Sequence, residues 1–140
     1  MTWRISQTDD ITTCYALRRI VFIEEQGVSE ADDVDGRDDA DLHVLATRDG
    51  TPLGCARILL SGDVAKIGRV CVLKEARGTG LGAAIIAACL DVARAQPGAS
   101  IAKLGAQTHA LAFYEKLGFV AFGPVYDDAG IPHRDMERAL

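Results

Sequence analysis

A glycine-rich turn that leads into a long apolar segment constrains the fold more than any other feature of the sequence. The turn reads Arg77-Gly78-Thr79-Gly80-Leu81-Gly82. The segment that follows is rich in Ala and Ile up to Ala95 and closes at Pro97-Gly98, as a buried helix does. Glycines let the backbone turn tightly, so that its N–H groups approach an anion at the positive end of the helix. Arg77 adds a fixed positive charge, and together these features outline a diphosphate site.

Two familiar phosphate-binding motifs do not fit this turn. No Gly-Lys-Ser/Thr run follows it, which excludes a Walker A loop. The glycines are spaced G-x-G-x-G, whereas a dinucleotide-binding fingerprint needs G-x-G-x-x-G after the first strand of a βαβ unit. Taken alone, the turn is better explained as one whose glycines only allow the backbone to enter the helix.

An apolar pattern near the N-terminus predicts the first helix. Its apolar positions are Ile11, Cys14, Leu17 and Val21. Thr8 or Asp9 is the expected cap, and the helix should end near Gln26-Gly27. The pattern leaves Arg18 and Arg19 on another face.

The remaining patterns predict strands and one further helix. The expected strands cover residues 3–5, 42–48, 52–60, 65–73, 100–106, 119–125 and about 133–137. Asp49-Gly50 and Gly62-Asp63 are turn signals that make the second to fourth strands an antiparallel meander. A helix over 108–117 ends at Gly118. The order is β-α-β-β-β-α-β-α-β-β, which predicts a mixed sheet with helices against it in a single domain, residues 1–140.

Composition excludes several classes of protein. Hydrophobic residues make up 49% and charged residues 25% of the chain, which argues against disordered and collagen-like proteins. The net charge of −5 argues against nucleic acid or an anionic membrane as the main partner. The most apolar run, residues 81–90, is too short to cross a bilayer, and residues 1–10 lack a signal-peptide pattern. We therefore expect a globular protein that no signal directs to a membrane.

The negative charge gathers in one segment. Residues 24–41 hold nine acidic residues against one basic residue, Arg37. Two interpretations of its loop from Glu30 to Asp41 remain open, namely a loop that attracts a cationic amine and a solvated loop that aids solubility. The pairs Asp33-x-Asp35 and Asp39-x-Asp41 lack the frame of an EF-hand, so no metal site is predicted.

The cysteines favour a reducing compartment. Cys14, Cys55, Cys71 and Cys89 each lie in an apolar run and are too far apart for a C-x-x-C pair. Free cysteines in such runs behave as small hydrophobic residues. We expect reduced core thiols in a cytoplasmic protein.

Several motifs occur in a characteristic order. The first set is Gly68 to Val72, Arg77-x-x-Gly80-x-Gly82, and Ala110-x-x-Phe113-Tyr114 continuing to Phe119. A second set is Leu17-Arg18 to Val21-Phe22, Glu25-Gln26, Asp41, His43, Ala106-Gln107-Thr108 and Gly130 to His133. The first set resembles the acetyl-CoA-binding core of the GNAT superfamily of N-acetyltransferases, and the second is similar to its small bacterial proteins of the ElaA and YjcF type. The resemblance implies an α+β, three-layer fold with a mostly antiparallel sheet and helices on both faces.

The resemblance also implies where acetyl-CoA binds. Its pantetheine arm would pair with a strand over 65–73 where this diverges from the strand over 100–106. The implied cofactor-binding residues are Val70, Cys71, Val72, Arg77, Gly78, Thr79, Gly80, Leu81, Gly82 and Gln107. Gln107 stands where many family members have Asn, and the side chain of Cys71 has no required role. No metal is implied.

The implied reaction is direct transfer of an acetyl group from the thioester to a primary amine. Tyr114 would protonate the departing thiolate, and a backbone N–H within 70–72 would stabilise the oxyanion. A base must accept the proton of the amine. Glu25, at the end of the first helix, is the first candidate and His133 the second, whereas His43 is interpreted as structural.

Other functions and assemblies remain open at this point. One alternative is a non-catalytic acyl-CoA-binding sensor, and another is a transferase or lactone synthase that uses a different acyl donor. The acceptor is a small amine or an exposed amino group of a larger molecule. Many members of the family form homodimers, but no stretch of this sequence identifies an interface.

Overall fold

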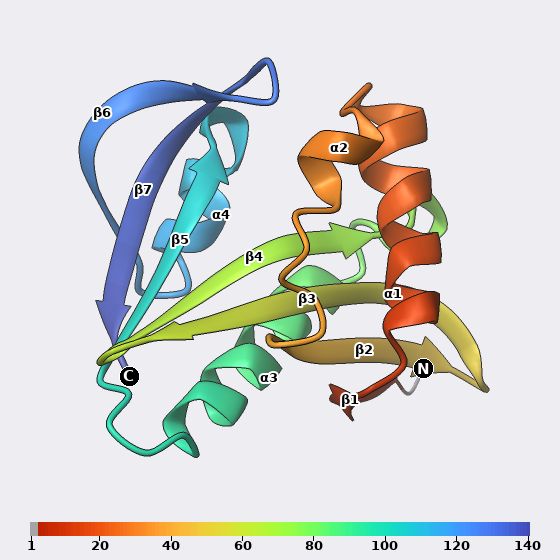
Figure 1. The fold of residues 1–140 in the computed structure, drawn as a ribbon, viewed down its shortest axis with the longest axis horizontal. Coiled ribbons are helices and arrows are strands. Elements are labelled where there is room, and N and C mark those ends of the chain that lie inside the picture. The colour runs from red at the N-terminus through yellow and green to blue at the C-terminus, as the bar shows by residue number, and fades with distance from the viewer. Residues whose placement is uncertain (1–2) are drawn as a thin grey trace.

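The computed structural model describes residues 3–140 and contains one seven-stranded mixed sheet with helices against both faces (Figure 1). The strands are β1 (Arg4–Thr8), β2 (Leu42–Arg48), β3 (Thr51–Ser61), β4 (Val64–Val72), β5 (Ile101–Gln107), β6 (Val120–Asp128) and β7 (Ile131–Ala139). Their spatial order is β1-β2-β3-β4-β5-β7-β6, and neighbours are antiparallel except for the parallel pair β4 and β5. The predicted α+β class and mostly antiparallel sheet are confirmed.

The helices depart from the sequence prediction at their ends. They are α1 (Ile11–Arg18), the π-helical η1 (Arg19–Glu25), α2 (Glu30–Asp33), the 3-10 turn η2 (Lys74–Ala76), α3 (Leu81–Arg94), the 3-10 turn η3 (Thr108–Ala110) and α4 (Leu111–Glu115). The predicted first helix is thus α1 continued by η1. Its cap is Asp10, whose carboxylate accepts from the Thr13 N–H, instead of Thr8 or Asp9. Of the helices within residues 3–140, none is long and apolar enough to span a membrane.

Two hydrophobic clusters hold the helices on the sheet. On one face, α3 buries Leu81, Ile85, Ile86, Cys89, Leu90 and Ala93, which recur at helical spacing. On the other face, Cys14, Leu17 and Val21 of the first helix pack against Cys55 and Cys71 of the sheet. All four cysteines are free and buried, as predicted. Figure 1 shows α1 in front of the strands and α3 behind them.

A bulge in β4 sets the shape of the sheet at its centre. Arg57 pairs with Gly68 and Cys55 with Cys71, so that Ala56 of β3 faces both Arg69 and Val70. Arg69 adopts the left-handed conformation with φ of 51°. A bulge of this kind bends its strand and increases the local twist.

The bent β4 leaves its neighbour β5 after a short contact. The two strands pair through Val64–Ile101, Ala65–Ala102 and Lys66–Lys103, and no further pair joins them. Beyond these residues β4 runs on to Val72 and β5 to Gln107, and the strands diverge in Figure 1. We call the space between them the wedge. The divergence predicted between these two strands is therefore present.

The packing of β3 against β4 and α3 predicts an effect for Gly54. A Cβ atom at Gly54 would lie 2.7 Å from the Cys71 carbonyl oxygen and 2.8 Å from Ile85 Cδ1. Gly54→Ala should therefore lower the free energy of unfolding by about 2 kcal/mol, because β4 and α3 must both move away from β3 to make room for the methyl group. Gly68→Ala is the matched control, since a Cβ there meets nothing within 4 Å. Urea unfolding measures both variants, and equal stabilities would contradict this account of the packing.

Candidate active site

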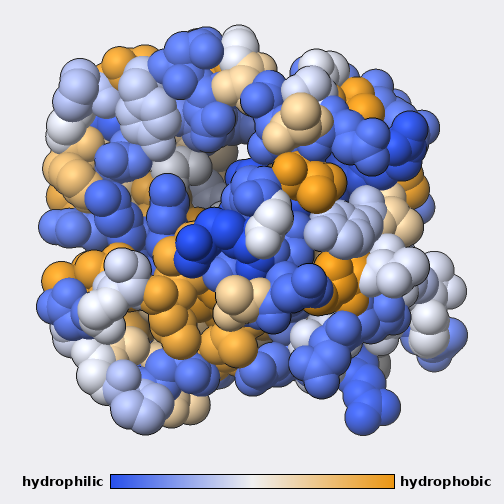
Figure 2. All heavy atoms as spheres, viewed as in Figure 1, coloured by the Kyte–Doolittle hydropathy of each residue, from blue (hydrophilic) through white to orange (hydrophobic). Residues whose placement is uncertain are grey.

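A pocket of about 240 Å³ lies beside the wedge. Its lining includes Phe22 and Gln26 from η1 and its end, Arg69 and Val70 of β4, Gly105 and Gln107 of β5, Tyr114 of α4, and Ile131 and His133 of β7. Figure 2 shows the surface hollowed between the side formed by β5 to β7 and the side formed by α1 and α2. The pocket therefore collects the predicted residues Val70, Gln107, Tyr114 and His133 from four separate elements.

The glycine turn forms an uncapped helix N-terminus. Gly80 occupies the N-cap of α3 with φ of 89°, a conformation that favours glycine, and no side chain caps this end. The first helical bond is donated by the Ala84 N–H to the Gly80 carbonyl, 3.1 Å away. The N–H groups of the first turn are thus free to meet an anion at the positive end of the helix dipole. This arrangement fits the diphosphate of coenzyme A.

Arg77, the first residue of this turn, already has two partners. Its Nη2 lies 2.6 Å from Glu25 Oε2, and its Nε donates to the Val72 carbonyl at 3.0 Å. Glu25 is not among the residues that line the pocket. The first candidate for the base is therefore held by the guanidinium of a predicted cofactor-binding residue.

Tyr114 forms part of the pocket wall and is anchored by aromatic contacts. Its ring meets Phe113 and Phe119 edge to face, with centroid distances of 5.0 and 6.0 Å. Burial, together with the nearby Cys89, raises the pKa of Tyr114 to about 12. The phenol therefore stays protonated near neutral pH, as a proton donor must.

His133 lies in the pocket with one ring nitrogen engaged. Its Nδ1 is 2.7 Å from the Ile131 carbonyl oxygen, and its ring stacks on Tyr126. A carbonyl only accepts, so this contact places the proton of the neutral imidazole on Nδ1 and leaves the lone pair on Nε2. His43 differs, since it is buried and its Nε2 contacts the Asp38 carbonyl, which agrees with a structural role.

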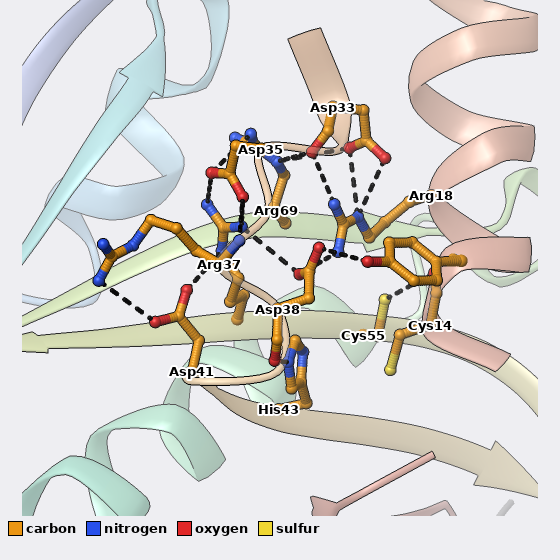
Figure 3. Close-up of polar contacts among 12 residues, drawn as sticks. Cys14, Arg18, Asp33, Asp35, Arg37, Asp38, Asp41, His43, Cys55 and Arg69 are labelled. Carbon is orange, nitrogen blue, oxygen red and sulfur yellow. Dashed lines mark hydrogen bonds and ion pairs between the residues drawn. The ribbon is translucent and has the colours of Figure 1, made fainter. Parts of the chain in front are cut away.

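A buried ion-pair network lies next to the pocket, and the sequence analysis missed it (Figure 3). Arg18 contacts Asp33 at 3.2 Å and Asp38 at 2.6 Å. Arg57 makes two bonds of 2.8 Å to the Asp35 carboxylate. Hydrogen bonds from Arg57 lower the pKa of Asp35. The acidic segment is therefore pinned to α1 and to the sheet.

Arg69 joins the network to the pocket. Its Nε donates to the Asp33 carbonyl, and its guanidinium lies 3.4 Å from Asp33 Oδ1 and 3.5 Å from Asp35 Oδ2. Arg69 is also the bulge residue of β4 and lines the pocket. Arg69 thus connects the acidic segment to the lining of the pocket.

The network corrects two interpretations of the sequence. Arg18 was expected away from the core face of its helix, yet it is 1% exposed, because Asp33 and Asp38 neutralise its charge. Residues 33–41 are neither a free acidic surface nor a fully solvated loop, since Asp33 and Asp38 are buried in ion pairs. The sequence signal that was overlooked is the presence of three arginines, at positions 18, 57 and 69, within predicted core elements, since buried arginines require carboxylate partners.

Comparisons with known proteins agree on one family. The family model described as "Acetyltransferase (GNAT) domain" matches residues 22–140. The chain is 35% identical to the uncharacterized N-acetyltransferase YjcF of Bacillus subtilis, over 91% of each chain. It is also 35% identical to the protein ElaA of Escherichia coli, covering 89% of this chain and 84% of that protein.

Solved structures show the same fold. The crystal structure of an acyl-CoA N-acyltransferase from Pseudomonas aeruginosa superposes with a TM-score of 0.86 at 33% identity, covering 99% of this chain and 100% of that one. The crystal structure of Escherichia coli ElaA gives a TM-score of 0.86 at 30% identity and covers 99% of both chains.

The network predicts a large stability effect for one of two neighbouring aspartates. Asp38 is 2% exposed and ion-paired, whereas Asp39 is exposed. Asp38→Asn should lower the free energy of unfolding by about 3 kcal/mol because it leaves a buried guanidinium undercompensated. Asp39→Asn should change it by less than about 0.5 kcal/mol. Chemical denaturation followed by circular dichroism compares them, and a similar small loss in both would show that the network contributes little.

Proposed function

Because the chain belongs to the acetyltransferase (GNAT) family, we propose that it transfers an acetyl group from acetyl-CoA to a primary amine by direct attack of the amine. The family predicted from the motifs is thereby confirmed, and the chain is an N-acetyltransferase of the GNAT type. The observation that carries the proposal is the wedge between β4 and β5. The uncapped N-terminus of α3 and the presence of Tyr114 in the pocket lining support it.

The backbone of β4 would hold the pantetheine arm. The Leu73 N–H donates to the Leu53 carbonyl on the β3 side, and backbone groups alternate in direction along a strand. This alternation favours Val70 and Val72 as the residues that offer groups to the wedge, with Cys71 turned toward β3. The diphosphate would lie against Arg77 and the N–H groups of residues 78–82.

Acetyl-CoA supplies an acyl group activated as a thioester, and the chain supplies donors and acceptors around it. A backbone N–H of β4 would stabilise negative charge on the thioester oxygen. The Tyr114 hydroxyl would give its proton to the departing sulfur. Its raised pKa keeps the hydroxyl protonated at neutral pH.

The proton of the amine would pass to His133. Its Nε2 carries the lone pair, and His133 lines the pocket. It would accept the proton from the amine either directly or through a water molecule. Glu25 was the first candidate from the sequence, but its carboxylate is paired with Arg77 outside the pocket lining. The geometry therefore favours His133 over Glu25 as the base.

The size and charge of the pocket favour a small acceptor. A volume of about 240 Å³ suits a small amine or the end of a flexible chain that carries an amino group. Asp32 and Asp128 lie in its lining and would attract the protonated form of that amine.

Thiol release from acetyl-CoA across a panel of primary amines tests this function. We expect release that depends on one class of amine and that saturates with both substrates. Tight binding of coenzyme A without thiol release for any amine would contradict the proposal and support a non-catalytic sensor. Faster thiol release with succinyl-CoA or a longer acyl-CoA than with acetyl-CoA would contradict acetyl-CoA as the donor.

Tyr114→Phe should separate chemistry from binding. The variant keeps the aromatic contacts with Phe113 and Phe119 but lacks the proton donor, so kcat should fall about 10- to 100-fold while the Kd of coenzyme A changes less than about twofold. Steady-state kinetics and calorimetry measure the two quantities. An unchanged kcat would remove Tyr114 from the mechanism.

The raised pKa of Tyr114 predicts the alkaline limb of the pH profile. A proton donor is lost as pH rises through its pKa, and here that pKa is about 12. In the wild type, kcat should therefore show no loss with a midpoint near 10, where an ordinary tyrosine titrates. A midpoint near 10 that Tyr114→Phe abolishes would contradict the effect of burial on this residue.

A further inference from the structure

Two adjacent residues at the end of η1 bridge the open end of the wedge. Glu25 pairs with Arg77, which follows β4, at 2.6 Å. Gln107, the last residue of β5, donates through Nε2 to Gln26 Oε1 at 3.0 Å. We call these two contacts the clasp. The clasp thus links the end of β4 to the end of β5, at the end of the wedge opposite to the three paired residues of each strand.

The clasp occupies groups that a bound acetyl-CoA would need. The proposed function assigns Arg77 to the diphosphate, and the family resemblance implies Gln107 as a further cofactor-binding residue. A carboxylate left 2.6 Å from the Arg77 guanidinium would neutralise its charge and repel the incoming diphosphate. The side chains of Glu25 and Arg77 are 32% and 43% exposed, so solvent and ligand can reach this contact. An exposed ion pair of this kind is weak and readily exchanged.

Building on the proposed function, we propose that the clasp is exchanged for the cofactor: the diphosphate replaces Glu25 on Arg77, and this release frees Gln26 from Gln107. Glu25 is then a positioning residue that acts through Arg77. Gln26 lines the pocket, so the exchange moves part of the pocket wall when the cofactor binds. Binding of the cofactor and the shape of the acceptor pocket are coupled through two neighbouring side chains.

Calorimetric titration with coenzyme A tests the exchange. Glu25→Gln should bind coenzyme A roughly two- to fivefold more tightly than the wild type, because the cofactor no longer competes with a carboxylate for Arg77. The apparent KM for acetyl-CoA should fall by the same factor. Pantetheine, which lacks the diphosphate, should bind equally to both proteins. Glu24→Gln removes the same charge from the exposed neighbouring residue and should leave the affinity unchanged.

A double-mutant cycle separates the clasp from general charge repulsion. In an Arg77→Gln background, which removes the cation that Glu25 contacts, Glu25→Gln should give less than half of its wild-type gain. Three outcomes would each overturn the exchange of the clasp. They are the same gain in coenzyme A affinity in that background, an equal gain in affinity for pantetheine, and no gain in the wild-type background. Wild-type protein that takes up no coenzyme A would instead overturn the proposed function on which the clasp rests.

Discussion

The short parallel contact between β4 and β5 determines where this protein can act. Three residues of each strand pair before the bulge at Arg69 bends β4 away, and the open strands then leave main-chain groups without sheet partners. Unpaired main-chain groups away from water are costly unless a ligand or solvent satisfies them. A strand-like arm of amides such as the proposed pantetheine arm would satisfy them, so the bulge in β4 creates the need that this ligand would meet.

The buried ion-pair network holds the bulge of β4 and the neighbouring acidic segment in place. Arg69 at the bulge, Arg57 on β3 and Arg18 on α1 share the carboxylates of Asp33, Asp35 and Asp38. Segment 30–41 is thereby fixed against the sheet and forms one side of the pocket through Asp32 and Asp33. Most acidic residues of this segment therefore hold one side of the pocket in place, and few of them remain to attract a substrate.

Local patterns carried the fold, whereas contacts between distant residues did not follow from the sequence. Strand alternation, the turn signals and the glycine turn predicted the order of elements, and the position of Tyr114 followed from its motif. Arg18 was misjudged because its burial depends on Asp33 and Asp38, which lie 15 and 20 residues later. Glu25 was the first candidate for the base because it lies at the end of the first helix. Its pairing with Arg77 was missed because Arg77 is 52 residues away, and no local pattern joins such a pair.

Amide hydrogen exchange with and without coenzyme A tests the central claim most directly. If the wedge and the uncapped helix end hold the cofactor, the N–H groups of Val70 and Val72 and those of Leu81 to Ala83 should exchange more slowly in its presence. Exchange that stays unchanged at these amides while coenzyme A is bound, with protection elsewhere in the chain, would contradict the account.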